Sequence, residues 1–195
     1  MAKMFPEILD SNVASMAEVI VHKQLKDQLG KNWTVFYGQP WYSSTKEHSP
    51  FREGECDFIL LNEELGIMII EVKGGMSIEY SPADNCWYST NKNDETFIIK
   101  DPYKQVKSNV SALLHTLQSV NQFKDLNRFY KDINVCFCVI FPEVDSVTGY
   151  EFFENHKMTT LLKDDLINVE KKMESIFKFH QNEASYSSQT TKDVI

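Results

Sequence analysis

Two near-continuous apolar runs lie in the first half of the chain. They cover residues 56–61 and 67–73 and are separated by a polar turn at residues 62–66. Apolar runs of this length, rich in isoleucine and bounded by turn residues, are typical of strands that are buried on both faces. The pattern therefore predicts two central strands joined by a tight hairpin.

An amphipathic helix is predicted ahead of these strands, over residues 10–29. Apolar residues recur along it at helical spacing, with Asp10 or Ser11 as N-cap and Gly30 as C-cap. We expect this helix to pack one face against the strands. Glu18 falls at the border of that face.

Two more helices are predicted after the central strands. The first begins with Asp101 as N-cap and Pro102 as its first residue, and Gln105 and Asn109 border its apolar stripe. The last covers residues 164–180. Both are expected to cover a sheet through their apolar faces.

Shorter strand candidates are distributed around these elements. A polar loop is expected at residues 39–50, and Pro142 ends the last strand candidate. The candidates cover residues 34–37, 76–80, 86–89, 96–99 and 134–141. The alternation of strands and helices indicates an α/β domain.

The composition favours one folded domain. Of the 195 residues, 42% are hydrophobic and 25% are charged, which is typical of a globular chain. We expect a domain over residues 1–180, followed by a polar tail or linker over residues 181–195. No apolar run approaches the roughly 20 residues that span a bilayer, and the N-terminus lacks a secretory apolar region. A cytoplasmic location without membrane contact is the default expectation.

The net charge of -8 argues against a protein that binds polyanions through bulk attraction. It does not exclude nucleic acid as a substrate, because metal-binding enzymes concentrate carboxylates at their sites. The cysteines form no C-x-x-C pair, so we expect buried reduced thiols rather than a zinc site or disulfides. They are Cys56, Cys86, Cys136 and Cys138.

The charged residues inside the two apolar strands are the main candidates for chemistry. If Leu61 faces Ile67 across the hairpin, antiparallel pairing places Asp57 opposite Glu71. Lys73 then projects from the same face as Glu71. Directly opposed residues have Cβ atoms about 4.5–5.5 Å apart, and like charges in such a pair are destabilising. A cation between the carboxylates would remove the conflict, whereas a register slip of one residue would separate them.

Two converging carboxylates suit a hard divalent ion such as Mg²⁺ or Mn²⁺, and no cysteine or histidine joins them to favour zinc. Lys73 adds positive charge beside the ion. Such a set lowers the pKa of a bound water, holds a scissile phosphate and neutralises charge in the transition state. The alternative interpretation is a buried structural salt bridge between Glu71 and Lys73.

Asp57 followed by the Glu-Val-Lys triplet at residues 71–73 resembles the active-site signature of the PD-(D/E)XK nuclease superfamily. The wider context is more narrowly similar to the nuclease-related domain family, NERD. It consists of residues 54–60 and 66–75, followed by Trp87. These segments contain both central strands.

The resemblance covers roughly residues 10–141 and implies a restriction-endonuclease-like fold, with a mixed central sheet flanked by helices. It also implies a metal bound by Asp57, Glu71 and the backbone carbonyl of Val72. Cys56 stands where members of the superfamily usually have a proline. Because that proline is not a metal ligand, the difference leaves the implied chemistry intact.

Family members further carry an acidic residue on the first helix and a glutamine on the helix after the strands, and Glu18 and Gln105 match these. The amide of Gln105 would orient a water or a phosphate. The alternative for Glu18 is an ordinary surface glutamate. His22, one turn later, either reaches the same cleft or is a solvated helix histidine.

Other residues are candidates for contacts with nucleic acid. Lysines near the start of the second helix either contact backbone phosphates beside the cleft or form a solvated face. They are Lys100, Lys104 and Lys107. Trp87 and Tyr88 are interpreted as sheet packing rather than as base-stacking residues.

The sequence thus predicts a Mg²⁺- or Mn²⁺-dependent nuclease that hydrolyses DNA. Asp57 and Glu71 would bind the metal, and Glu18 would support the metal or its water shell. Lys73 would stabilise the transition state, and Gln105 would orient the substrate. The alternatives are a non-catalytic nucleic-acid-binding or interaction module and a phosphodiesterase acting on RNA or nucleotides. NERD domains are often fused to helicase or kinase modules, some in phage-defence proteins, so a fused or associated helicase module is an expected partner.

Overall fold

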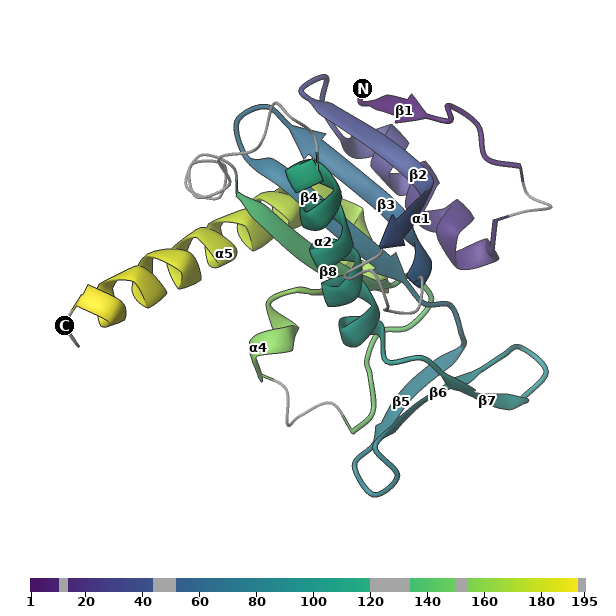
Figure 1. Cartoon of the computed structure of the whole chain (residues 1–195). Helices are drawn as coiled ribbons and strands as arrows, with labels where there is room; N and C mark the ends of the chain where they lie inside the picture. Colours follow the sequence, from purple (N-terminus) through teal and green to yellow (C-terminus); the bar gives the residue numbers. More distant parts are fainter. Residues whose placement is uncertain (11–13, 44–51, 120–133, 150–153, 193–195) are drawn as a thin grey trace.

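The computed structural model of the chain describes residues 1–10, 14–43, 52–119, 134–149 and 154–192 (Figure 1). Within these residues, a six-stranded mixed sheet forms the centre of the molecule. Its strand order is β1 (Lys3–Phe5), β2 (Trp33–Ser43), β3 (Arg52–Asn62), β4 (Gly66–Val72), β8 (Val135–Phe141) and β9 (Thr160–Leu162). The pairs β2–β3 and β3–β4 are antiparallel, and the other neighbours are parallel. The predicted α/β class with a mixed central sheet is confirmed and is consistent with a nuclease-like fold.

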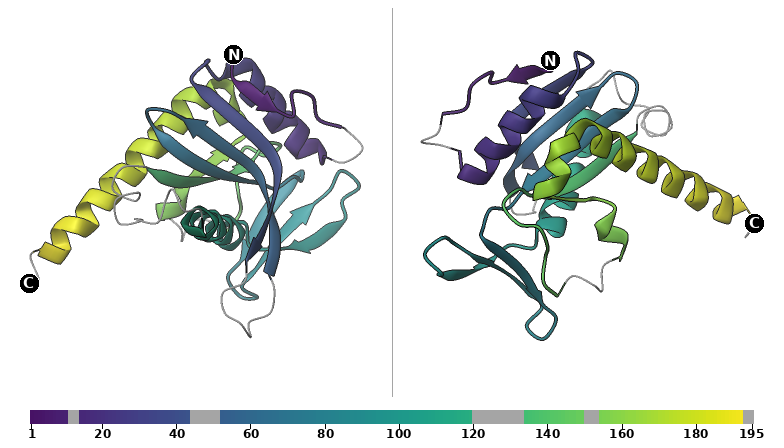
Figure 2. Two further views of the ribbon diagram at one scale, coloured as in Figure 1. Left: turned by 45° about the horizontal axis from the view of Figure 1, so that its top comes forward. Right: turned by 180° about the vertical axis from the view of Figure 1, so that it is seen from behind.

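Helices cover both faces of this sheet (Figure 2). One face carries α1 (Met16–Gln28), α5 (Val169–Lys192) and the 3₁₀ helix η2 (Lys163–Asn168). The other face carries α2 (Pro102–Ser119). A short helix, α4 (Glu154–Lys157), precedes β9. In the described part of the chain, no helix combines the length and apolar character that a membrane crossing requires.

The two-sided covering explains the apolar runs of the central strands. In β4, Met68, Ile70 and Val72 belong to the core under α1 and α5, whereas Ile69 belongs to the core under α2. Because successive side chains of a strand point to opposite faces, such a strand needs apolar residues at nearly every position. Glu71 interrupts this pattern although it is only 1% exposed.

All four cysteines are free thiols, as predicted. Cys56, Cys136 and Cys138 are buried, and Cys86 is partly buried. Burial, together with the neighbouring carboxylates, raises the pKa of Cys56 to about 12. A thiol that stays protonated at neutral pH acts as a small packing group rather than as a nucleophile.

The first helix starts later than predicted. Its N-cap is Ser15, not Asp10 or Ser11, and Ser11 lies outside the described residues. The Ser15 hydroxyl accepts a hydrogen bond from the Glu18 N–H at 3.3 Å, and the Glu18 carboxylate accepts one from the Ser15 N–H at 2.8 Å. This reciprocal capping box satisfies two amide groups at the helix start. It needs a glutamate or glutamine three residues after the cap, which follows Ser15 in the sequence but neither Asp10 nor Ser11.

The predictions were also wrong at the end of α1 and at both ends of the last helix, whereas α2 begins at Pro102 as predicted. The C-cap of α1 is Leu29, one residue before Gly30. The last helix is preceded by the 3₁₀ turn η2, and its backbone stays helical to Lys192, beyond the predicted end at residue 180. The sequence after Gly149 contains no glycine or proline, so no helix breaker ends α5 earlier. The segment predicted as a polar tail is therefore largely helical, and its role as a linker stays a prediction.

β2 is longer than the strand predicted at residues 34–37. It runs to Ser43, so the predicted loop is wrong for Gln39 and Pro40, which lie in the strand. β1 was not predicted, and it pairs only with the start of β2. Beyond that point no strand among the described residues pairs with this side of β2, so the missing N–H of a proline breaks no ladder there. Residues 44–50 of the predicted loop lie outside the described residues.

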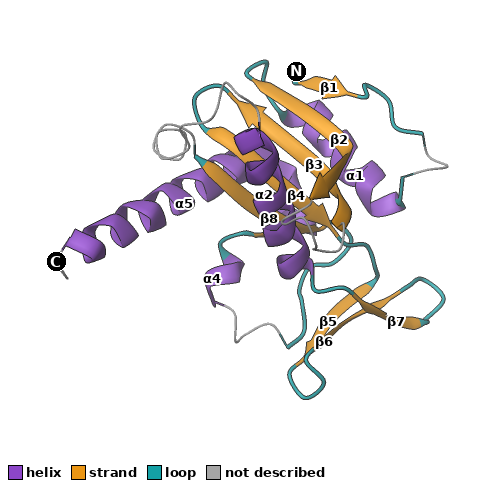
Figure 3. Ribbon diagram, viewed as in Figure 1, coloured by secondary structure: helices purple, strands orange, loops and turns teal. Residues whose placement is uncertain are grey.

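Three strands form a separate small sheet, which we term the arm and which projects from the domain (Figures 1 and 3). It consists of β5 (Ser77–Ser81), β6 (Cys86–Thr90) and β7 (Thr96–Ile99), paired antiparallel in that order. Trp87 is 3% exposed and packs against Tyr103 and Phe141, which confirms its predicted packing role. Phe97 of β7 is 52% exposed.

The connection from β4 to the arm is fixed by hydrogen bonds at both of its glycines. The Gly75 N–H donates to the Glu143 carboxylate at 2.8 Å, and the Ser89 hydroxyl donates to the Gly74 carbonyl at 2.7 Å. Gly75 has φ near +147°, and a Cβ there would lie 2.2 Å from the Ser89 hydroxyl oxygen. Only glycine fits this junction without strain.

Candidate active site

The β3–β4 hairpin has the register that the sequence predicts. Leu61 pairs with Ile67, and the last pair of the ladder lies one residue short of Asp57 and Glu71. The two acidic residues therefore occupy the position where β4 begins to part from β3. Lys73 follows directly after β4.

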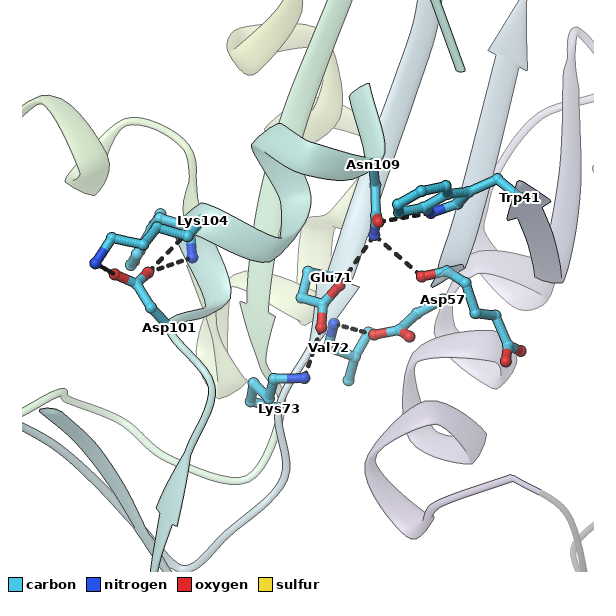
Figure 4. Close-up of polar contacts among 10 residues, drawn as sticks. Trp41, Asp57, Glu71, Val72, Lys73, Asp101, Lys104 and Asn109 are labelled. Carbon is cyan, nitrogen blue, oxygen red and sulfur yellow. Dashed lines mark hydrogen bonds and ion pairs between the residues drawn. The ribbon is translucent and has the colours of Figure 1, made fainter. Parts of the chain in front are cut away.

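Asp57 is held against the backbone of β4. Its Oδ2 accepts a hydrogen bond from the Val72 N–H at 2.6 Å (Figure 4). Burial, then the charge of Glu71 and more weakly that of Glu18, raises the pKa of Asp57 to about 7, although the Val72 bond and Lys73 act in the opposite direction. The raised pKa reports a largely buried carboxylate next to the negative charge of Glu71.

Glu71 is engaged at both of its oxygens. Oε1 accepts from the Lys73 ammonium at 2.5 Å, and Oε2 accepts from the Asn109 amide at 3.3 Å. Burial raises the pKa of Glu71 in spite of the Lys73 charge. The salt bridge between Glu71 and Lys73, which the alternative interpretation predicts, is thus present. It lies next to the Asp57 carboxylate.

Asn109 and Trp41 extend the polar network around Glu71 (Figure 4), and the sequence reasoning assigned no role to either. Asn109 is 4% exposed; its amide also donates to the Glu55 carbonyl at 3.1 Å, and its Oδ1 accepts from the Trp41 indole N–H at 2.9 Å. A signal for Asn109 existed, because it borders the apolar stripe one turn after Gln105. Trp41 lies in the segment predicted as a loop, where nothing distinguished it.

These side chains line a cavity of about 620 Å³ between the sheet and α2. Its polar lining includes Asp57, Glu71, Lys73, Lys100, Gln105 and Asn109. Gln105 Oε1 is buried there and has no hydrogen-bond partner among the described residues. A buried acceptor without a partner is uncommon in folded proteins and indicates a place for a ligand or water.

One of the three predicted phosphate-binding lysines reaches this cavity. Lys100 lines it, whereas Lys104 and Lys107 do not. Lys104 is 75% exposed in its side chain and pairs with Asp101 at 3.3 Å. The Lys107 ammonium lies 5.6 Å from the centre of the Phe137 ring. These two lysines are on other sides of α2 from Gln105.

α1 contributes to the site only from the opposite face of the sheet. Glu18 does not line the cavity, and its carboxylate accepts a hydrogen bond from the Tyr37 hydroxyl at 3.0 Å. His22 is 6% exposed and its Nε2 lies 3.1 Å from the Pro6 carbonyl oxygen. It is neither the solvated histidine nor the cleft residue that the sequence suggested.

The comparison with protein families matches this chain to one of them. The family model for the nuclease-related domain, NERD, covers residues 14–147. The chain belongs to this family. The matched segment extends from the start of α1 past β8 and contains every cavity residue named above. No match is found among curated proteins or among solved structures.

The donors of this NERD site fit a divalent metal ion. Asp57 and Glu71 supply hard oxygen atoms, and burial, the largest cause of both raised pKa values, disfavours their charged forms, which a bound cation would stabilise. Within the described residues, no group of three histidine, cysteine, aspartate or glutamate side chains could hold a metal. Further ligands would therefore be the Val72 carbonyl and waters, which Mg²⁺ commonly retains.

Proposed function

We propose that this NERD chain is a metal-dependent nuclease that hydrolyses phosphodiester bonds of DNA. The observation that carries the proposal is the pair of largely buried acids, Asp57 and Glu71, next to the ammonium of Lys73 in a cavity of about 620 Å³. Family membership indicates a nuclease-related domain in general, and this pair supports the specific chemistry.

Asp57, Glu71 and the Val72 carbonyl would hold Mg²⁺ or Mn²⁺. When bound, such an ion polarises a phosphate and makes a water more acidic. Lys73, now paired with Glu71, supplies positive charge for the phosphoryl oxygens, on which negative charge accumulates in the transition state. With a cation beside Glu71, the ammonium of Lys73 would be available to a phosphoryl oxygen of the substrate.

Gln105 and Lys100 position the substrate in this mechanism. The unpartnered Gln105 Oε1 accepts a hydrogen bond from a water, and its amide nitrogen donates to a phosphate oxygen. Lys100 provides a cation at the cavity wall. Glu18 adds negative charge near the acid pair from the α1 side, so we assign it a supporting electrostatic role.

DNA cleavage by purified protein tests the proposal. Single- and double-stranded DNA are incubated with the wild type, Glu71→Gln and Lys73→Met, in Mg²⁺, in Mn²⁺ and with a chelator. We expect cleavage only by the wild type with metal. Lys171→Met, at an exposed position of α5, is the matched control and should cleave normally. Cleavage that persists in both Glu71→Gln and Lys73→Met would refute the proposed nuclease mechanism.

A non-catalytic nucleic-acid-binding module is the second candidate. It is favoured by the closed ion pair of Glu71 with Lys73, because such a pair needs no metal. Calorimetric titration with Mg²⁺ separates the two candidates. Absence of heat, together with unchanged DNA affinity in Asp57→Ala, would favour the module.

We further propose that the domain acts together with a helicase module, in a role such as phage defence. With a net charge of -8, the domain alone should bind DNA weakly and with strong salt dependence, so a partner that holds the strand would help. Mass spectrometry of the protein from its natural source tests for such a partner. Comparison of DNA and RNA turnover decides between the two nucleic acids.

A further inference from the structure

A second cavity, of about 310 Å³, adjoins the candidate active site. It lies between β2, β3 and α2, and its lining includes Pro40, Trp41, Cys56, Ile59, Leu113 and Thr116. Among the described residues, none that lines this cavity is charged, which distinguishes it from the catalytic cavity. Because a cavity of roughly 150 Å³ already binds benzene, this one has room for a purine or a pyrimidine.

Trp41 is the wall that the two cavities share. It is partly exposed, whereas the other two tryptophans, Trp33 and Trp87, are 2% and 3% exposed. All three lie in the described part of the chain. Trp41 is therefore the tryptophan that a ligand in either cavity would contact.

The indole of Trp41 is oriented before any ligand binds. Its N–H donates to Asn109, which in turn donates to Glu71, so two hydrogen bonds connect the ring to the proposed metal-binding carboxylate. Gly54 packs directly against the ring, since a Cβ there would lie 2.4 Å from its nearest atom. With its polar group already satisfied, the ring offers apolar aromatic surface at low entropic cost.

We propose that the second cavity, which we term the base cavity, binds a nucleobase stacked on Trp41 while the adjoining phosphate lies in the catalytic cavity. The proposal rests on the nuclease function proposed above and adds the substrate class. The uncharged lining suits a neutral base and excludes a phosphate. Stacking on an aromatic ring accepts every base, because each base has a π face.

Entry of a base into this cavity requires that it leave the duplex. A paired base is stacked on both sides by its neighbours, and one enclosed beside Trp41 must be unstacked and unpaired. The substrate class is therefore a single strand, or a duplex region that exposes an unpaired nucleotide near the scissile phosphate. DNA and RNA share the base chemistry, so both are included in the test.

Tryptophan fluorescence with short oligonucleotides tests the proposal. Lys73→Met protein, in which cleavage is blocked on the proposed mechanism, is titrated in Mg²⁺ with a thymidine oligomer, a uridine oligomer, a matched duplex and an abasic oligomer of equal length. We expect the two single strands to quench the Trp41 emission. The duplex and the abasic strand should not. Quenching by only one single strand would identify the natural nucleic acid.

Variants locate the effect at the base cavity. Trp41→Phe should remove the fluorescence change, and Trp41→Ala should weaken binding of the thymidine oligomer roughly tenfold or more, as expected for loss of one stacked base. Phe97→Ala, an exposed aromatic on the arm, is the matched control and should bind normally. If Trp41→Ala fails to fold, Thr116→Phe, at an exposed position of α2, fills the cavity and should weaken binding similarly.

Equal binding of abasic and thymidine oligomers, or the absence of quenching, would overturn the proposal that this cavity binds a base. Cleavage by the wild type tests the nuclease proposal separately. Quenching without any cleavage would support the base-cavity proposal and refute the nuclease proposal. Cleavage that is unaffected by Trp41→Ala and Thr116→Phe would support the nuclease proposal and refute the base-cavity proposal.

Discussion

Replacement of Asp57 by asparagine should stabilise the metal-free protein at neutral and alkaline pH. In the folded protein, burial and the Glu71 charge raise the pKa of Asp57 from 3.8 to about 7. The folded state therefore holds a proton that the unfolded chain releases, and the free energy of unfolding falls as the pH rises between these two values. Asparagine carries no charge there, and its amide oxygen can still accept the Val72 N–H.

The size of the effect follows from the pKa difference. At about 1.4 kcal/mol per pKa unit, full ionisation of Asp57 destabilises the folded state by about 4 kcal/mol at most. Roughly 2–3 kcal/mol of this appears between about pH 5 and about pH 8. The stability advantage of Asp57→Asn over the wild type should grow by that amount across the interval. Comparison of the two proteins cancels opposing contributions, such as that of His156, whose pKa is lowered by burial and by Lys107.

Urea denaturation in chelator at several pH values measures this difference. Asp145→Asn, at an exposed loop position, removes a carboxylate away from the acid pair and is the matched control. Addition of Mg²⁺ should stabilise the wild type more at high pH than at low pH, because metal ligands must be deprotonated, and should leave Asp57→Asn nearly unchanged. A pH-independent difference between wild type and Asp57→Asn would refute the electrostatic description of the acid pair.

Three further substitutions test the packing and the network. Ile70→Ala, at a fully buried position of β4, should lower the free energy of unfolding by about 2–5 kcal/mol, measured by urea denaturation; a loss below about 1 kcal/mol would contradict the tight core. Asn109→Ala should cost about 1–3 kcal/mol in the same assay, because it leaves the Trp41 N–H and a Glu71 oxygen without their partner, and it should also lower the Mg²⁺ affinity measured by calorimetry. Unchanged Mg²⁺ affinity in Asn109→Ala would show that this hydrogen-bond network does not contribute to metal binding. Ser15→Ala should cost about 1 kcal/mol through loss of the α1 cap, and Ser111→Ala on the exposed side of α2, which should cost much less, is its control.

The centre of the fold and the acid pair were predictable because local features determine them. The turn between β3 and β4 is short, so the apolar pattern fixes the pairing of Leu61 with Ile67 and, through it, the proximity of Asp57 and Glu71. The cap at Asp101 was also predictable, because its carboxylate accepts from the N–H groups of the next residues in sequence, Tyr103 and Lys104.

Features that depend on distant partners were not predictable from one sequence. Asn109 binds groups of Trp41, Glu55 and Glu71, which are 38 or more residues away along the chain. The start of α1 was ambiguous because several residues before it can cap a helix, and only the reciprocal bonds of Ser15 with Glu18 select one. β1 and β9 are three residues long, and the alternation of apolar and polar residues that indicates a strand cannot be recognised over so few positions.

The position of the arm within the chain places its base next to the candidate site. The arm lies in the connection between β4 and α2, and the residues at its two ends, Gly75 and Lys100, adjoin Lys73 and the wall of the cavity. Its base is locked to Glu143 by the Gly75 N–H, so changes farther out leave the sheet in place. Changes in the length or charge of the outer part of the arm would therefore leave the acid pair in place. The outer part of the arm is thus structurally independent of the acid pair.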